Sequence, residues 1–452
     1  MGHTHQPERR GFLKLSARLA ALGLTGVGLG PARSFFVSEA SAAPQISDYK
    51  ALVCVYLFGG NDSNNTIVPM DSARYTAYQS LRGNLALTGS KLLPPISDAN
   101  GNPYAFHYGL PEMNTLYATG HLAVVLNVGQ LNRPLTRAEY QQGLSAPTNL
   151  FSHSDQTTQT QTCTSQTVSS GWGGRLLDLF NASDTLAAVS VSSPALFLQG
   201  QDVRSNVIPP GANLSLSGMN FWPPQAADAR RQAVNAMVLL DNGHPLREAA
   251  NRAFADGLQL ADTLQLNGSL PPMNAVFPNT SIGNQLKEVA RLIRVRSQMG
   301  PGRQVFFCSM GGFDTHSGQD WQHWNLLSQL SQGLYAFAVA TLELGVAHQV
   351  TTFTQSEFSR TMQSNGSGSD HAWGAHQLVL GGAVRGGIYG TMPTFAFSGP
   401  DDANNRGVWI PTIAASQFGA TLGRWFGASP GELGWAFPNL ANFSAYDLGF
   451  MA

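Results

Sequence analysis

Carboxylates and a histidine follow three separate apolar runs of the chain, and this distribution points to a metal site. Asp62 follows the first run after two glycines, Asp314 and His316 follow another, and Glu357 follows a third. Carboxylate oxygens and imidazole nitrogens together suit zinc, manganese or iron better than calcium. Each motif alone is also typical of an ordinary turn, so the prediction depends on their coming together. Charged residues make up only 12% of the chain. In such a chain, several of these motifs are less expected to follow strands by chance.

The strongest local signal is Asp370 next to His371, directly after the glycine- and serine-rich stretch 365–369. A bending loop would let both side chains turn toward one cluster, although a solvated surface turn is the ordinary alternative. His376 is interpreted as a third donor or, with slight preference, as a residue that begins a strand. His323 is interpreted as a packing residue on the first turns of a helix rather than a ligand.

A hydrolase at this centre would also need an anion-binding group and a nucleophile. Arg360 could hold an anionic group in a bidentate manner, and a structural ion pair with Glu357 is the alternative. Ser152 and Ser154 precede a helix rich in Thr and Gln, where the helix dipole favours an alkoxide or a bound anion. We prefer the simpler interpretation that a serine caps this helix and that His153 packs beneath it.

The elements that must position these side chains alternate between strands and helices. Apolar runs predict strands at 51–58, 122–126, 186–191, 305–308, 350–353 and 378–380, and apolar spacing predicts helices at 282–293, 320–344 and 414–426. This alternation predicts an α/β fold with a mostly parallel sheet. In such a sheet ligands bind beyond the carboxyl ends of the strands, where the motifs above lie. An irregular insertion or lid is expected over about 193–275, with a helical pair in its second half.

The amino terminus predicts export. Residues 8–14 contain a twin arginine followed by Phe-Leu-Lys, a weakly apolar stretch follows, and 40–42 supplies the small residues of a cleavage site. We therefore expect a twin-arginine signal peptide over 1–42 and a mature α/β domain over 43–452. The twin-arginine translocase would be a partner during export, and the protein would be periplasmic or secreted.

Composition excludes several classes of protein. The chain has 452 residues with a formal net charge of −1, which argues against a nucleic-acid binder. Beyond the amino terminus, no segment approaches the apolar length of a membrane span, so no stable span is expected. The three cysteines, Cys54, Cys163 and Cys308, exclude a disulfide framework, and one disulfide is possible if the protein is exported. Cys54 and Cys308 lie in apolar strand-like runs and are expected to be buried.

Together these motifs resemble a family of bacterial, twin-arginine-exported proteins known as domain of unknown function 1501. The matching pieces are Phe58 to Asp62, Gly312 to His316, Ser356 to Arg360, Asp370 to Gly374 and Val408 to Gly427. The family looks like a distant branch of the alkaline phosphatase and sulfatase superfamily. The resemblance implies an alkaline-phosphatase-like, doubly wound α/β sandwich with metal ligands at strand ends.

On this resemblance, Asp62 matches the superfamily's first-strand aspartate, and Asp314 with His316 matches its second metal-binding pair. Glu357 falls where an aspartate is usual, and His371 matches a late histidine ligand. A formylglycine sulfatase is set aside, because none of the three cysteines lies in the required motif.

The sequence thus predicts an exported metal-dependent hydrolase of phosphate or sulfate esters, carried on a small molecule or a polymer. One or two divalent cations, such as zinc or manganese, would be held by Asp62, Asp314, His316, Glu357, Asp370 and His371. The alternative is a non-catalytic exported binding or assembly protein that retains the fold.

Overall fold

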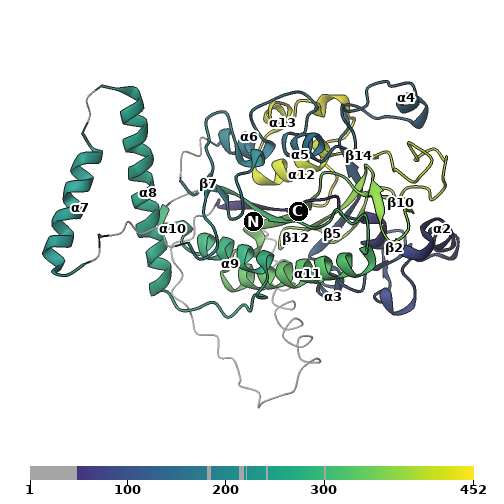
Figure 1. Cartoon of the computed structure of the whole chain (residues 1–452), viewed down its shortest axis with the longest axis horizontal. Helices are drawn as coiled ribbons and strands as arrows, with labels where there is room; N and C mark the ends of the chain where they lie inside the picture. Colours follow the sequence, from purple (N-terminus) through teal and green to yellow (C-terminus); the bar gives the residue numbers. More distant parts are fainter. Residues whose placement is uncertain (1–47, 181–184, 213–217, 220, 241–242, 300–301) are drawn as a thin grey trace, which may run out of the picture. The chain divides into compact units, whose positions relative to one another are not determined.

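A nine-stranded, mostly parallel sheet forms the centre of the protein (Figure 1). The structure is a computed structural model, and it describes residues 48–452 except 181–184, 213–217, 220, 241–242 and 300–301. The strand order is β13-β5-β12-β9-β1-β8-β6-β7, with β14 paired to β5. The predicted signal peptide lies outside the described residues.

The central strands are buried along almost their whole length. β1 (Lys50–Leu57) pairs in parallel with β8 (Arg303–Met310) on one side and β9 (Val350–Gln355) on the other. Helices cover both faces of these strands, so their side chains are apolar in both directions and the sequence shows an unbroken apolar run. The α/β fold and the six predicted strands are confirmed.

β12 (Ala375–Gly381) runs antiparallel to its neighbours β9 and β5 (Leu122–Gly129). Because its direction is reversed, its first residue lies at the edge where the parallel strands end. The segment that precedes β12 therefore meets the loops that follow β1, β8 and β9. This one reversed strand brings residues before a strand and residues after other strands to the same edge.

Helices pack on both faces of the sheet (Figure 1). One face carries α3 (Pro111–Ala118), α9 (Ser281–Arg294) and α11 (Gln319–Glu343), and the other carries α5 (His153–Thr162), α6 (Trp172–Asp178), α12 (Ala415–Phe426) and α13 (Pro430–Ala436). α9 buries Ile282, Leu286, Val289 and Ile293, the stripe from which it was predicted. The three predicted helices are confirmed, and the sheet is doubly wound.

Short elements complete the domain. They are β6 (Ala188–Ser190), β7 (Asn206–Val207), β13 (Gly387–Tyr389), β14 (Ile413–Ala414), α2 (Ser72–Arg82), α4 (Arg137–Gln141) and α10 (Arg296–Met299), with a small sheet of β2 (Ile67–Pro69), β4 (Pro103–Phe106) and β3 (Ile96–Ser97). β10 (Arg360–Ser364) and β11 (Ser369–His371) form a separate antiparallel pair. The predicted insertion contains the helical pair α7 (Pro224–Val238) and α8 (Pro245–Ser269).

Two further sequence predictions agree with the structure. Cys54 and Cys308 are buried as expected, Cys163 is buried as well, and all three are free, so no disulfide forms among them. Within the described ranges, none of the helices combines the length and the apolar character that crossing a membrane requires.

Candidate metal centre

Three side chains converge at the carboxyl edge of the sheet. His153 begins α5, Asp314 lies in the loop after β8, and His371 ends β11. One ligand atom from each lies within 4.8 Å of the other two. His371 Nε2 is 3.2 Å from Asp314 Oδ1, and His153 Nε2 is 3.5 Å from Asp314 Oδ2. Two bonds of about 2.1 Å at a tetrahedral angle separate their donors by about 3.4 Å, so each of these two contacts, one to each oxygen of Asp314, is close to the spacing around a zinc-sized ion.

The tautomers of the two histidines, His153 and His371, follow from their other contacts. His371 Nδ1 is 2.8 Å from the carbonyl oxygen of Phe151, which can only accept a hydrogen bond. His153 Nδ1 is 2.8 Å from Glu357 Oε1. In each ring Nδ1 therefore carries the proton, and Nε2 presents a lone pair toward Asp314. A histidine whose second nitrogen is fixed by a carboxylate or carbonyl is typical of metal ligands.

Glu357 thus orients a ligand instead of taking part in the three-member set. Its Oε1 also accepts a hydrogen bond of 2.8 Å from the backbone nitrogen of Gly59. Its side chain is 1% exposed. The structure places it behind His153, where it would act through that ring.

His316 repeats the same arrangement beside the set. Its Nε2 lies 3.0 Å from Asp314 Oδ1 and 3.0 Å from His371 Nε2, while its Nδ1 lies 3.2 Å from Asp370 Oδ1. Asp370 therefore bonds to the far side of a histidine, as Glu357 does. Of the six predicted ligands, Asp314 and His371 lie in the converging set and His316 lies next to it.

Asp370 is held as an anion by its neighbours. Partial burial would raise its pKa, but hydrogen bonds from Asn365 and Arg406 outweigh burial and lower the pKa to about 2. Arg406 Nη2 is 2.5 Å from Asp370 Oδ2. An ionised Asp370 is an acceptor that favours the Nδ1–H tautomer of His316.

The ionisation of Asp314 and His371 favours cation binding, whereas the ionisation of His153 opposes it. Partial burial opposes ionisation of Asp314, but the charges of Arg360 and the nearby histidines hold its pKa below the ordinary value. Burial and the charge of Arg360 lower the pKa of His371, although its bond to a backbone carbonyl opposes the shift. The hydrogen bond to Glu357 raises the pKa of His153 against the effect of burial.

Arg360 lies under this centre with free hydrogen-bonding capacity. It begins β10 and pairs in register with His371, which explains its position. Its Nη2 donates to Asp314 Oδ1 over 2.9 Å, and its side chain is 0% exposed. Within the described residues, its buried Nε and Nη1 have no hydrogen-bond partner. Leaving buried donors unpaired is costly, so such a group is a candidate for binding an anion.

Asp62 is not among the converging ligands. Its carboxylate is fully buried in an ion pair with Arg82 and also accepts a hydrogen bond from Gln319. Burial raises its pKa, although the charges of Arg82 and Arg360 oppose the shift. Contrary to the expectation, Asp62 is therefore not positioned to bind the same ion. Instead it joins the loop after β1 to α2 through Arg82 and to α11 through Gln319.

Ser152 is the N-cap of α5, as the simpler interpretation predicted. Its oxygen accepts a hydrogen bond from the backbone nitrogen of Asp155 and donates to Asp155 Oδ2 over 2.5 Å. Ser154 Oγ lies 3.2 Å from Ser152 Oγ. Among the described residues, no hydrogen bond joins either hydroxyl to the three converging side chains. The expectation that His153 packs beneath the cap is wrong, because its side chain is 38% exposed and belongs to the centre.

His153 is therefore the candidate ligand that sequence reasoning missed. It follows no apolar strand, so the rule that located the other candidates could not select it. The available signal was its place one residue after an N-cap serine, since helix starts in this fold also lie at the ligand-binding edge. His376 is the second residue of β12, in agreement with the preferred strand-start interpretation, and its Nδ1 accepts a hydrogen bond from the backbone nitrogen of Asn127. His323 is buried against Asn61, in agreement with a packing role.

Comparison with known proteins identifies a family. The profile described as "Protein of unknown function (DUF1501)" matches residues 49–405. Among curated proteins, none matches the sequence. Two solved structures show a distant likeness, one of Ps i-CgsB in complex with k-i-k-neocarrahexaose and one of Ps i-CgsB. They are 10% and 8% identical to the chain with TM-scores of 0.35, and each match covers 84% of this chain and 72% of the other. Likeness at this level says nothing about function.

Proposed function

The chain belongs to the family described as Protein of unknown function (DUF1501), and because that description names no activity, we propose a function from the geometry of the site. We propose that the protein is an exported, metal-dependent hydrolase of phosphate or sulfate esters. The observation that carries this proposal is the convergence of His153, Asp314 and His371 within 4.8 Å. Two imidazoles and one carboxylate fit zinc, manganese or iron, since imidazole nitrogen and carboxylate oxygen are donors that these ions accept.

His316 would complete the ligand set or leave a position for substrate. Its Nε2 is 3.0 Å from Asp314 Oδ1, and Asp370 keeps it in the tautomer that a ligand requires. The side chains of His153, Asp314 and His316 are 38%, 46% and 45% exposed, so an ester could approach them from solvent. When bound, a divalent cation would polarise the ester and lower the pKa of water.

The protein's own residues would bind and orient the anionic part of the ester. Arg360 has a buried guanidinium with two free donor atoms beside Asp314, and a guanidinium can hold phosphate or sulfate oxygens in pairs. We propose water as the attacking group in preference to Ser152 or Ser154, because Asp155 already binds both hydroxyls.

We propose further that the protein has an alkaline-phosphatase-like fold and acts in the cell envelope or outside the cell. A ligand set at the carboxyl edge of a doubly wound sheet supports the superfamily placement. The twin arginine within residues 8–14 supports export by the twin-arginine translocase to the periplasm or the exterior.

Metal content tests the centre directly. Elemental analysis of the purified protein should find about one transition-metal ion per chain, and the double variant Asp314→Ala/His371→Ala should hold below about 0.1. Asp228→Ala/His244→Ala, which changes the same residue types at exposed positions, is the matched control and should retain the metal. Loss of metal in both double variants, or none in the parent protein, would remove the basis of the proposal.

One observation favours a second function, that of a non-catalytic binding protein. Arg360 already pairs with Asp314 at 2.9 Å, so the carboxylate is balanced without a cation. A screen of phosphate and sulfate monoesters in the presence of zinc and manganese separates the two functions. Turnover that is lost in Asp314→Ala supports the hydrolase, whereas absence of turnover for every ester, with or without metal, supports the binding protein.

A further inference from the structure

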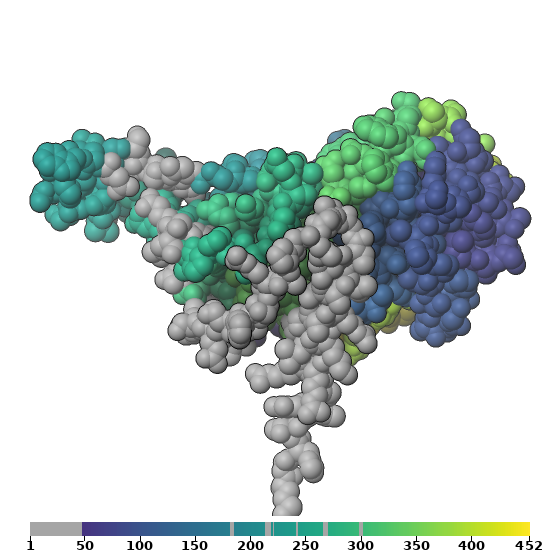
Figure 2. Space-filling view, turned by 90° about the horizontal axis from the view of Figure 1, so that it is seen from below, coloured from purple at the N-terminus to yellow at the C-terminus, as the bar shows by residue number. Residues whose placement is uncertain are grey.

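The helices α7 and α8, coloured teal in Figure 2, project from one side of the domain and leave many of their apolar side chains uncovered. α7 has 15 residues, and Ala227 is its one buried side chain. The large apolar side chains exposed on and beside this hairpin are Trp222, Met237, Leu239, Leu240, Leu246 and Phe254. Leu239 is 81% exposed and Leu246 is 76% exposed. A helix of this length is only marginally stable without a packed apolar face, so another surface is needed to cover it.

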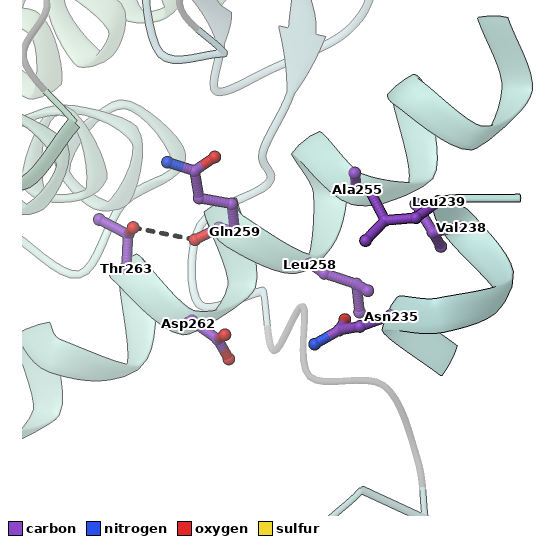
Figure 3. A pocket seen from close by; sticks show the side chains of 8 residues that line it. All are labelled: Asn235, Val238, Leu239, Ala255, Leu258, Gln259, Asp262 and Thr263. Carbon is purple, nitrogen blue, oxygen red and sulfur yellow. Dashed lines mark hydrogen bonds between the residues drawn. The ribbon is translucent and has the colours of Figure 1, made fainter. Parts of the chain in front are cut away.

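A groove runs between the two helices (Figure 3). Val238 and Leu239 from the end of α7 and Ala255 and Leu258 from α8 form its apolar lining, and polar side chains such as Gln259 border it. The hairpin thus carries both an apolar groove and projecting apolar side chains. A surface that carries both a groove and the side chains to fill one is suited to self-association about a twofold axis.

Charge favours a protein partner over a lipid surface. α7 carries two arginines and one aspartate, whereas α8 carries two arginines and three acidic residues. The hairpin therefore lacks the excess of basic residues that draws an amphipathic helix to an anionic membrane. The opposite net charges of the two helices favour a contact between α7 of one molecule and α8 of another.

We propose that a second copy of this chain covers the hairpin. The two hairpins pack about a twofold axis as a four-helix bundle, with α7 of one copy against α8 of the other. Met237, Leu240 and Leu246 of each copy enter the groove of its partner. The dimer forms through the insertion and is independent of the metal centre, because the two share no residue.

Light scattering coupled to size-exclusion chromatography tests the proposal on the purified full-length protein. The parent protein should have twice the chain mass of 48.2 kDa, and Leu239→Glu/Leu246→Glu should have the mass of one chain. Gln232→Glu, which adds one negative charge at an exposed position of α7 without removing an apolar side chain, is the control and should remain a dimer. Circular dichroism checks that helix content is retained in each variant.

A milder variant keeps the test decisive if the double variant misfolds. Leu246→Asn alone should raise the dimer dissociation constant by about tenfold or more, the size of loss typical of an interface anchor. A monomeric parent protein would overturn the proposal, as would double and single variants that dimerise like the parent. Binding of a monomeric parent to vesicles of phosphatidylcholine and phosphatidylglycerol, lost in Leu239→Glu/Leu246→Glu, would assign the surface to a membrane and would equally overturn it.

Discussion

Replacing Glu357 by glutamine should weaken metal binding through His153 while keeping the fold. Glu357 Oε1 lies 2.8 Å from His153 Nδ1 and accepts a second hydrogen bond of 2.8 Å from the backbone of Gly59. Glutamine has nearly the same shape, and its amide oxygen can accept both bonds. The substitution therefore removes the negative charge behind the imidazole and little else.

The size of the effect follows from the position of His153. Loss of a partner that orients a metal-bound histidine typically lowers metal affinity by about 10- to 100-fold. The side chain of His153 is 38% exposed, so solvent screens part of the interaction with Glu357. We therefore expect the lower end of that range, about tenfold, which corresponds to about 1.4 kcal/mol.

Isothermal titration of the metal-free protein with zinc measures this change. Glu343→Gln is the matched control, because Glu343 accepts backbone hydrogen bonds from Asn274 and Ala275 and is absent from the converging set. A second readout is the pKa of His153 in the metal-free protein, which should fall because its bond to Glu357 is the main cause of its elevation. Zinc affinity unchanged in Glu357→Gln, or lowered equally in Glu343→Gln, would refute the assigned role.

Three other outcomes follow from the structure. Arg82→Met leaves the fully buried carboxylate of Asp62 without its cation. The free energy of unfolding, measured by urea denaturation, should therefore fall by about 3–5 kcal/mol. A loss below about 1 kcal/mol would contradict a buried ion pair. Burial lowers the pKa of His376 to about 3, so below about pH 6.5 the unfolded chain takes up a proton that the native protein does not. Stability should therefore fall as pH drops, by about 2 kcal/mol between about pH 7 and about pH 5 from this residue, and His376→Gln should flatten that dependence in denaturation curves. Gly59 has a φ of +115°, and a Cβ there would overlap the backbone of Phe313 and Asp314. Gly59→Ala should therefore reduce both stability and zinc affinity. Gly431→Ala, with open space around the added Cβ, should reduce neither.

The sheet was predictable because its signal is local. β1, β8 and β9 are each covered on both faces, so each appears as a continuous apolar run that needs no knowledge of its neighbours. α9 was predictable for the same reason, because the helical period determines which of its residues face the core. Residues that follow such strands could then be placed at one edge.

The limits of the strand-end rule appear at His153 and Asp62. His153 reaches the centre from a helix start, and no run of residues around it reveals that contact. Asp62 follows a strand, as the rule requires, yet Arg82 and Gln319 enclose its carboxylate. Both partners are distant in sequence, so the difference between an exposed ligand and a buried anchor could not be predicted.

The sequence alone determined the buried central strands and the main helices, because backbone geometry imposes a local period on their apolar residues. It also determined most of the chemical groups that are available at the edge of the sheet, His153 being the exception. Only the tertiary structure decided which of those groups come together. Their convergence depends on the reversed direction of β12 and on the β10–β11 pairing that places Arg360 beside His371. It also depends on how α5 packs against the sheet. Contacts between segments far apart along the chain are set by packing, and packing leaves no periodic trace in either segment.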